Sequence, residues 1–469
     1  MIQRVIALCV FFIAANLFAD ENVFDTERLP IGDPARKYDF CAVKLDKILD
    51  TKANQNISTD QLIKGLQHFR IVMIGETHTN QLHHDMQLAV MKGLTEAGKK
   101  VCLALEMFTP SQNDALQKWV KGELTEDEFM DQVDYFNTWG HNYRYYQAIF
   151  QYAKAQHIPM FGVNTDHEYA SKIGMHGLAG LSLEEAAAIP VVDTSNVEHR
   201  YFVKVAMEGM DATAPAQFKN IYAAQSLWDT VMGEGAIDVA KKHPDAIVLV
   251  FAGSGHVAYN LGIGRIINDR SEFPFASIVA VDVPDSVEES VMMKVKKSIK
   301  KQRKTDDADS TASDMSGTAM EKSPSHTMPA MPGMSEQKTD DKKMPPMSMM
   351  HGMGSMEDTP YHIVSRSLAD FLWGKKQLKD EEYPSFGFSI DDPVEQGFPV
   401  KRIIPESIAE KQGLKQGDII VSIDGTTFKT MSALKKHLHF KNWGDSITFV
   451  VLREDKKVTI SFTIEPVGE

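Results

Sequence analysis

Two apolar segments of the chain each end in a Gly-x-x-His motif. The segment IVMIGETH ends in Gly75, Glu76 and His78, and the segment IVLVFAGSGH ends in Gly253 and His256. Imidazole and carboxylate groups together can hold a transition metal or haem iron, or move protons during hydrolysis. We therefore expect the two histidines to contribute to a single site, although they are far apart in the sequence.

Other polar residues follow apolar segments in the same way. Glu106 lies at the end of LALE, and Asn164 ends MFGVN. His83 and His84 come shortly after the first motif, where they could line the site or lie on a helix surface. Because the carboxyl ends of parallel strands meet at one edge of a sheet, these groups should meet the two motif histidines there.

An aromatic stretch between the two motifs offers further candidate ligands. It contains Trp139, His141, Tyr143, Tyr145 and Tyr146. Tyrosinate and histidine both ligate haem iron, so these residues could line a porphyrin pocket. A run of aromatic residues on a helix is also typical of a hydrophobic core, and both interpretations stay open.

The elements that must position these residues are strands and helices in alternation. Between residues 25 and 295, amphipathic stretches separate strand-like segments, which are RIVMIGE, KVCLALEM, IPMFGVN, AIVLVFAGS and ASIVAVDV. Such alternation is typical of a helix-flanked, mostly parallel sheet. We therefore predict an α/β domain over residues 25–295.

Several motifs occur here in a characteristic order: GETHTNQLHH, LALEMF, FGVN and FAGSGHVAYNLGIGRI. In this order they resemble the ChaN-like domain of the haem-binding-uptake/Tiki superfamily. The resemblance implies an α/β fold with Glu76, His78, Glu106 and His256 around one site and Asn164 beside them. ChaN-type members are bacterial envelope proteins linked to haem or iron uptake. Tiki members resemble metal-dependent proteases, and other relatives, of the erythromycin-esterase-like type, hydrolyse esters.

The resemblance therefore implies three alternatives for the function. The α/β domain binds haem or a divalent transition metal, or it is a metal-dependent hydrolase or protease, or it is a non-catalytic scaffold. In the enzyme, His78 and His256 hold metal or move protons, and Glu76 or Glu106 activates water. The candidate metal ligands are His78, Glu106 and His256, and the candidate cofactor-binding residues are His78, His83, His84, Tyr143, Asn164 and His256.

Residues 296–370 differ in composition and predict a disordered linker. Ser, Thr, Asp, Pro and Gly dominate, and branched aliphatic residues are almost absent. Between Met315 and Met356 the segment is rich in methionine, whose thioether is a soft donor that favours Cu(I). The alternative is a linker of biased composition that acts as an oxidant sink. The candidate copper ligands are Met328, Met331, Met334, Met347, Met349, Met350, His351 and Met353.

Residues 371–469 contain short strand-like segments and one helical segment, SALKKHLHF, as in a small, partly open β-barrel. FGFSI, followed by VKRIIPESIAEKQGLKQGDIIVSIDGTTF, resembles a PDZ domain of the bacterial HtrA-like type. The resemblance implies that a peptide or a protein C-terminus adds to a sheet edge. A PDZ fold used only for internal packing is the alternative. The implied peptide-binding residues are Phe386, Gly387, Phe388, Ser389 and Ile390.

The beginning of the chain predicts export. A short basic start, Met1–Arg4, precedes the apolar stretch Val5–Ala15, and Leu17-Phe18-Ala19 is a suitable cleavage site. We therefore expect a signal peptide at residues 1–19 and a location in the periplasm or cell envelope. Membrane attachment stays open.

Charge and cysteine content set further bounds. A net charge of −14 argues against nucleic-acid binding, which needs a basic surface. After the predicted leader, Cys41 and Cys102 remain. An oxidising compartment would allow a disulfide between them, and buried free thiols are the equal alternative.

Overall fold

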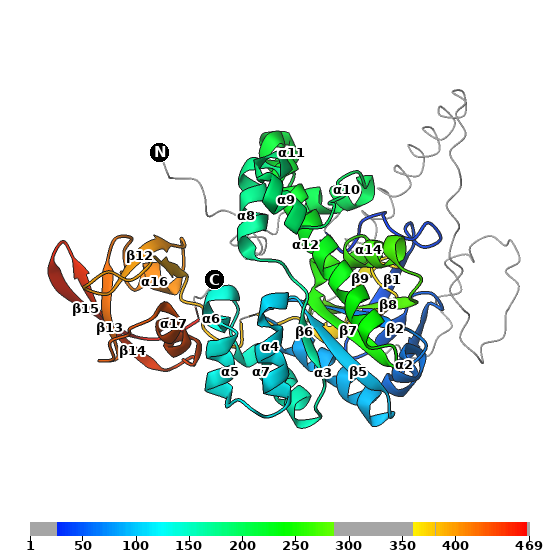
Figure 1. Cartoon of the computed structure of the whole chain (residues 1–469), viewed down its shortest axis with the longest axis horizontal. Helices are drawn as coiled ribbons and strands as arrows, with labels where there is room; N and C mark the ends of the chain where they lie inside the picture. Colours follow the sequence, from blue (N-terminus) through cyan, green and yellow to red (C-terminus); the bar gives the residue numbers. More distant parts are fainter. Residues whose placement is uncertain (1–25, 286–359, 380, 467–469) are drawn as a thin grey trace, which may run out of the picture.

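The computed structural model describes residues 26–285, 360–379 and 381–466. These residues form a larger domain, in which helices cover both faces of a sheet, and a smaller domain of strands and short helices beside it (Figure 1). The predicted signal peptide, residues 1–19, lies outside the described residues. So does the predicted linker up to residue 359, with all its candidate copper ligands.

Within the described residues, the larger domain contains an eight-stranded sheet in the order β3-β2-β10-β8-β4-β7-β5-β6. All neighbours from β10 to β6 run parallel, and β2 and β3 extend the sheet in antiparallel pairing. The strands are β2 (Ile48–Asp50), β3 (Gln55–Ile57), β4 (Ile71–Glu76), β5 (Lys100–Leu105), β6 (Met160–Gly162), β7 (Ala246–Gly253), β8 (Phe275–Val283) and β10 (Phe371–Lys376).

This arrangement confirms the predicted α/β fold with a mostly parallel sheet. The five predicted strand segments form β4, β5, β6, β7 and β8, which are consecutive neighbours in the sheet. Every residue of β4 and β7 is buried, as expected for central strands that helices cover on both faces. The carboxyl ends of β4, β5, β6 and β7 therefore lie along one edge.

Side-chain alternation along the strands divides the core into two layers. In β4, Val72 and Ile74 pack into one cluster, and Ile71 and Met73 pack into the other. Helices α2, α3, α4 and α7 cover the first layer, and α10, α12 and α14 cover the second. The helices are α2 (Thr59–Leu66), α3 (Gln81–Glu96), η1 (Pro110–Gln112), α4 (Asn113–Val120), α5 (Glu126–Gln132), α6 (Tyr135–Thr138), α7 (Arg144–Ala155), α8 (His167–His176), η2 (Leu178–Gly180), α9 (Leu183–Ala188), α10 (Val197–Ala206), α11 (Met210–Thr213), α12 (Pro215–Lys242), α13 (Ser254–Val257), η3 (Ala258–Asn260) and α14 (Ile263–Arg270).

Two strands, one inside the predicted linker and one directly after it, belong to the first domain. We expected the linker to end at residue 370 and the PDZ domain to begin at 371. Instead, β9 (Tyr361–Ser365) pairs with β1 (Phe40–Lys44), and β10 lies between β8 and β2 of the main sheet. The physical reason is burial, because Phe371 and Leu372 join the apolar clusters of the first domain.

The smaller domain is a five-stranded antiparallel sheet with two helices in its described part, which agrees with the predicted PDZ fold. Leu434 and Leu438 of α17 pack into one core with Phe386 and Phe449. The elements are β11 (Phe388–Ile390), β12 (Phe398–Ile403), α16 (Ile408–Lys411), β13 (Ile419–Ile423), α17 (Met431–His439), β14 (Ser446–Arg453) and β15 (Lys456–Thr463).

Both remaining cysteines are buried free thiols in this structure. Of the two open alternatives for Cys41 and Cys102, the disulfide is therefore not formed here. Burial raises the pKa of the Cys41 thiol to about 12 and that of Cys102 to about 11, so both are protonated and inert at neutral pH. In the part of the chain that the structure describes, no helix is both long and apolar enough to span a membrane.

Candidate functional site

The first group of site residues surrounds the carboxyl end of β4. Glu76 is the last residue of the strand, and its Oε1 atom lies 2.8 Å from Nδ1 of His78. The Tyr146 hydroxyl donates a hydrogen bond to the same oxygen at 2.7 Å. Nδ1 of His84 lies 3.1 Å from the other carboxylate oxygen. One buried carboxylate thus holds two imidazoles and a phenol in place.

The charges of this group stabilise one another. Burial disfavours the ionised form of Glu76, but the charge of His84 and the hydrogen bonds from His84 and His78 outweigh it. The pKa of Glu76 therefore lies well below its usual range. Burial also opposes the charged form of His78, and its hydrogen bond with Glu76 and the nearby charge of Glu106 raise its pKa. His78 is consequently a stronger base than a free imidazole.

The second group lies behind the ends of β5 and β7. The backbone N–H of Gly253 donates to Oε2 of Glu106 at 2.6 Å. Nε2 of His256 lies 3.4 Å from Oε1 of Glu106, and its Nδ1 lies 2.7 Å from Oδ1 of Asp229. Nε2 of His199 lies 3.1 Å from Oδ2 of Asp229. These contacts form a buried chain in which imidazoles and carboxylates alternate, in the order His199, Asp229, His256 and Glu106.

His256 lies between two carboxylates. Burial would lower its pKa, but the charges of Glu106 and Asp229 raise the pKa of His256 to about 10. Its Nε2 faces Glu106, and its Nδ1 faces Asp229, which α12 places against the ring. Ligation of a metal or cofactor by His256 stays a prediction.

The two groups meet at Gly253. A Cβ atom added to this glycine would lie 3.1 Å from Nε2 of His78 and 3.8 Å from Oε2 of Glu106. His78 also interacts electrostatically with both Glu106 and His256. The structure thus brings the two Gly-x-x-His motifs into one site, with a glycine where the groups are most crowded.

Aromatic rings form the rim of the site. The His78 ring centroid lies 5.1 Å from that of Trp139 and 4.4 Å from that of His141. Burial lowers the pKa of His141 to about 3, so this imidazole is neutral. Tyr143, a predicted cofactor residue, does not join them. Tyr143 directly precedes α7, and its hydroxyl donates instead to Glu126 at 2.9 Å.

The remaining predicted residues support the site. Nδ1 of His83 accepts the backbone N–H of Thr77 at 2.9 Å, and its Nε2 lies 3.1 Å from Asp282. His83 therefore shapes the loop before His78 and is buried, not on a helix surface. The side-chain amide of Asn164 donates to the backbone carbonyl of Glu106 at 2.9 Å and fixes the end of β5.

Asp229 and His199 were missed by the sequence reasoning. Both lie within helices, α12 and α10, and no local motif marks either residue. A buried aspartate in the middle of a long helix is the one signal that could have suggested a partner for a histidine. Tyr146 belonged to the aromatic stretch noted in the sequence, but its bond to Glu76 was not foreseen.

The predicted peptide-binding residues lie at one edge of the smaller sheet. Phe386 is buried, and Phe388, Ser389 and Ile390 are half-buried on the edge strand β11. Gly387 has a φ of +75°, and a Cβ atom there would lie 2.2 Å from Cβ of Ser407, so only glycine fits this turn.

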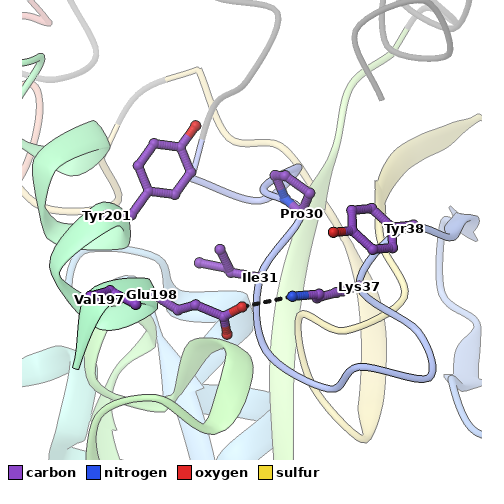
Figure 2. A pocket seen from close by; sticks show the side chains of 7 residues that line it. All are labelled: Pro30, Ile31, Lys37, Tyr38, Val197, Glu198 and Tyr201. Carbon is purple, nitrogen blue, oxygen red and sulfur yellow. Dashed lines mark hydrogen bonds and ion pairs between the residues drawn. The ribbon is translucent and has the colours of Figure 1, made fainter. Parts of the chain in front are cut away.

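Two other features lie apart from these sites. A cavity of about 340 Å³ is lined by residues that include Lys37 and Glu198, which form an ion pair at 2.9 Å (Figure 2). Its lining contains none of the sheet-edge residues described above. Within the described ranges, no group of three or more His, Cys, Asp or Glu side chains is arranged to hold a metal ion.

Comparison with protein families gives two matches. Residues 62–267 match the family described as "Haem-binding uptake, Tiki superfamily, ChaN". Residues 377–464 match the PDZ domain. The Periplasmic serine endoprotease DegP of Salmonella typhimurium is 31% identical over 71 residues, which is 15% of this chain and 15% of that protein. The chain spans 20% or less of the length of the curated relatives that it matches.

Two solved structures resemble the larger domain. One, on cofacial heme binding to ChaN of Campylobacter jejuni, has 18% sequence identity and a TM-score of 0.42. The match covers 53% of this chain and 93% of that one. The other, a mutant erythromycin esterase in its open conformation, has 11% identity and a TM-score of 0.32, and covers 53% of this chain and 78% of that one.

Proposed function

Because the chain contains a ChaN-like domain followed by a PDZ domain, we propose that it binds haem at the sheet-edge site and a peptide at the PDZ edge strand. One observation supports the haem assignment above all. His78 is oriented through Nδ1 by the ionised Glu76, and its Nε2 has no hydrogen-bond partner among the described residues. A carboxylate that holds a histidine in this way fixes its tautomer and strengthens it as a ligand.

The residues around His78 fit a haem group. Its side chain is 22% exposed. Trp139 and the neutral His141 lie beside it and offer flat rings to a planar ligand. Haem would supply an iron centre with its own redox and ligand chemistry. His78 would hold the group, with its ring oriented by Glu76 and that carboxylate fixed by Tyr146.

Titration of the full chain with hemin tests this proposal. The Soret band should shift on binding, and His78→Ala should weaken the affinity by about tenfold or more, because a ligand bond to iron is lost. His68→Ala, at an exposed histidine, is the matched control and should bind like the wild type. Equal affinities of the wild type and His78→Ala would contradict the proposed ligand.

A hydrolase is the second candidate, and the pairing of His78 with Glu76 favours it. A histidine whose Nδ1 is held by a carboxylate can take a proton from water through Nε2, as in a catalytic triad. A divalent metal, if the reaction requires one, would find nitrogen and oxygen donors in His78 and Glu106. Turnover of peptide or ester substrates that Glu76→Gln abolishes, with folding intact, would favour this candidate over a binding protein.

We also propose that the protein is exported to the periplasm or cell envelope. The basic start and apolar stretch of residues 1–19 support this location. Fractionation of cells, with and without residues 1–19, tests it. The wild type should appear in the envelope or periplasmic fraction as a shortened chain, and the truncated form should stay in the cytoplasm.

Copper binding by the methionine-rich segment is a further proposal, and it is supported by residue chemistry alone. Between Met315 and Met356, thioethers alternate with Pro, Gly, Ser and His. These soft donors favour Cu(I). Elemental analysis of the protein isolated from its native compartment should find copper, and deletion of residues 315–356 should remove it. Equal copper content after the deletion would contradict the proposal.

A further inference from the structure

Helix α17 of the PDZ domain lies against the first domain at α5 and α6, as Figure 1 also shows. Nζ of Lys436 lies 2.7 Å from Oδ1 of Asp127, in the first turn of α5. The ring of His439 meets that of Phe136, in α6, edge to face at 5.1 Å. Because Leu434 and Leu438 of the same helix pack into the PDZ core, α17 is shared between the two domains.

The loop after α17 contacts the segment that leads into α7. The side-chain amide of Asn142 donates to the backbone carbonyl of His439 at 2.8 Å. The Arg144 guanidinium donates to the side chain of Asn442 at 2.6 Å and to the carbonyl of Lys441 at 2.5 Å. Directional hydrogen bonds of this kind fix the relative position of the two elements better than apolar contact alone.

The same segment also holds the sheet-edge site. Tyr146, two residues after Arg144, donates to Glu76, and His141, three residues before it, places its ring against His78. Between them, the ring of Tyr145 meets that of Tyr383, at the entrance to the PDZ domain, at 4.8 Å. Residues 141–146 therefore contact the PDZ domain and the candidate haem site at once.

The edge strand β11 and helix α17 belong to the same part of the PDZ domain, because residues of both pack into one apolar core. A peptide that added to β11 would therefore extend the sheet that packs on α17. A movement of α17 on peptide binding would pass from His439 to Asn142, and from the loop residue Asn442 to Arg144.

We propose that peptide binding in the PDZ groove and ligand binding at the sheet-edge site are energetically coupled through residues 141–146. The peptide partner is an extended chain with a free carboxyl terminus, because β11 is an edge strand of a PDZ domain, and PDZ domains bind such peptides by strand addition. Linkage makes the effect reciprocal, so a ligand beside His78 changes the affinity for the peptide by the same factor. The identity of the second ligand as haem rests on the function proposed above.

Hydrogen exchange of the full chain tests the coupling without haem. The probe is a peptide selected for binding to the full chain from a library with free carboxyl termini. It should change the exchange of residues 141–146 and 76–79 as well as that of β11. Protection confined to the PDZ domain would overturn the proposal, and so would failure to select any peptide, because the groove would then have no occupant.

The variant Arg144→Met tests whether the coupling between the two sites can be lost while peptide binding itself is kept. The variant keeps an apolar side chain over Tyr383, whose ring lies 3.9 Å from the guanidinium, but it loses the hydrogen bonds to Asn442 and Lys441. Peptide should still protect β11 in this variant, and residues 76–79 should no longer respond. Asn142→Ala should act in the same direction, and Lys401→Ala, at an exposed residue of β12, should behave like the wild type. A full response at residues 76–79 in both interface variants would contradict the proposed route.

Peptide affinity with and without saturating hemin supplies the second readout. In the wild type we expect a change of about fivefold or more, and in Arg144→Met a change close to onefold. If hemin does not bind at all, the proposed haem function fails, and the exchange experiment still decides on the coupling. If hemin binds and the peptide affinity is unchanged, the coupling fails and haem binding stands.

Discussion

The site is defined by buried carboxylates, each of which is paired with an imidazole. Glu76, Glu106 and Asp229 are each less than 10% exposed, and each contacts at least one imidazole. A buried carboxylate without such a partner would be costly, so these residues depend on one another. Glu76 contacts Nδ1 of His78, whereas Glu106 and Asp229 face the two nitrogens of His256. In the proposed function His78 is the ligand, and His256 holds charge between the two carboxylates.

Replacement of Asp229 by asparagine tests the second role. Asp229→Asn should lower the pKa of His256 from about 10 and destabilise the protein by about 3–5 kcal/mol, because one partner of a buried pair is removed. Nuclear magnetic resonance titration of the imidazole and urea unfolding measure the two effects. Asp238→Asn, at an exposed position of the same helix, should change neither. Unchanged stability in Asp229→Asn would contradict this account.

The pH dependence of stability follows from the same residues. The folded pKa values of Glu76, Glu106 and Asp229 are lowered, so their stabilising contribution is present above the unfolded values, near pH 4, and is lost as pH falls further. For His256 the folded pKa is raised, so its contribution is complete below about pH 6.5 and is lost as pH rises to about 10. Urea unfolding from pH 5 to 10 should show this alkaline loss, and His256→Gln should reduce it. If the wild type and His256→Gln lost the same amount of stability at alkaline pH, groups other than His256 would be responsible for that loss.

At the scale of elements, two glycines of the PDZ domain allow two costs of substitution to be measured. Substitution of Gly425 strains the backbone only, and substitution of Gly387 strains the backbone and also crowds a neighbouring side chain. Gly425 has a φ of +77° with no atom within 4 Å of an added Cβ, and Gly387 has a similar φ but would clash with Ser407. Gly425→Ala should therefore cost about 1–2 kcal/mol of stability, and Gly387→Ala distinctly more, with loss of peptide binding. Thermal unfolding and peptide titration measure both. Equal effects of the two substitutions would contradict the described turn.

The sequence was informative about strands and less so about helices. The strands β4 and β7 could be predicted because each is an apolar segment that runs directly into glycine and polar residues. The parallel order then placed His78 and His256 at one edge. Asp229 and His199 could not be found in this way, since their side chains reach the site from helices whose orientation depends on tertiary packing. The same reason explains why Tyr146, and not Tyr143, contacts the site.

At the scale of the whole molecule, the chain leaves the first domain after β8 and returns to it with β9 and β10. The sequence analysis placed the domain boundary between residues 370 and 371. The pairing of β10 with both β8 and β2 shows that these residues complete the first sheet before the PDZ domain begins. The two domains then contact each other again through α17.

Truncation tests this division. A chain that ends at residue 370 lacks β10 and the buried Phe371, Leu372 and Trp373, each worth about 1.5–3 kcal/mol of burial. It should be largely unfolded by circular dichroism. A chain that ends at residue 379 keeps β10 and should retain the secondary structure of the first domain. Equal folding of both truncated chains would contradict the placement of β10 in the sheet.

The central claim is that His78 is the ligand that the sheet-edge site offers to haem. Pulsed electron paramagnetic resonance of the hemin-bound full chain, grown with ¹⁵N-histidine, tests it directly. The account predicts coupling between the iron and a histidine nitrogen in the wild type, and loss of that coupling in His78→Ala but not in His68→Ala. Persistence of the same histidine coupling in His78→Ala, or its absence from the wild type, would contradict the account.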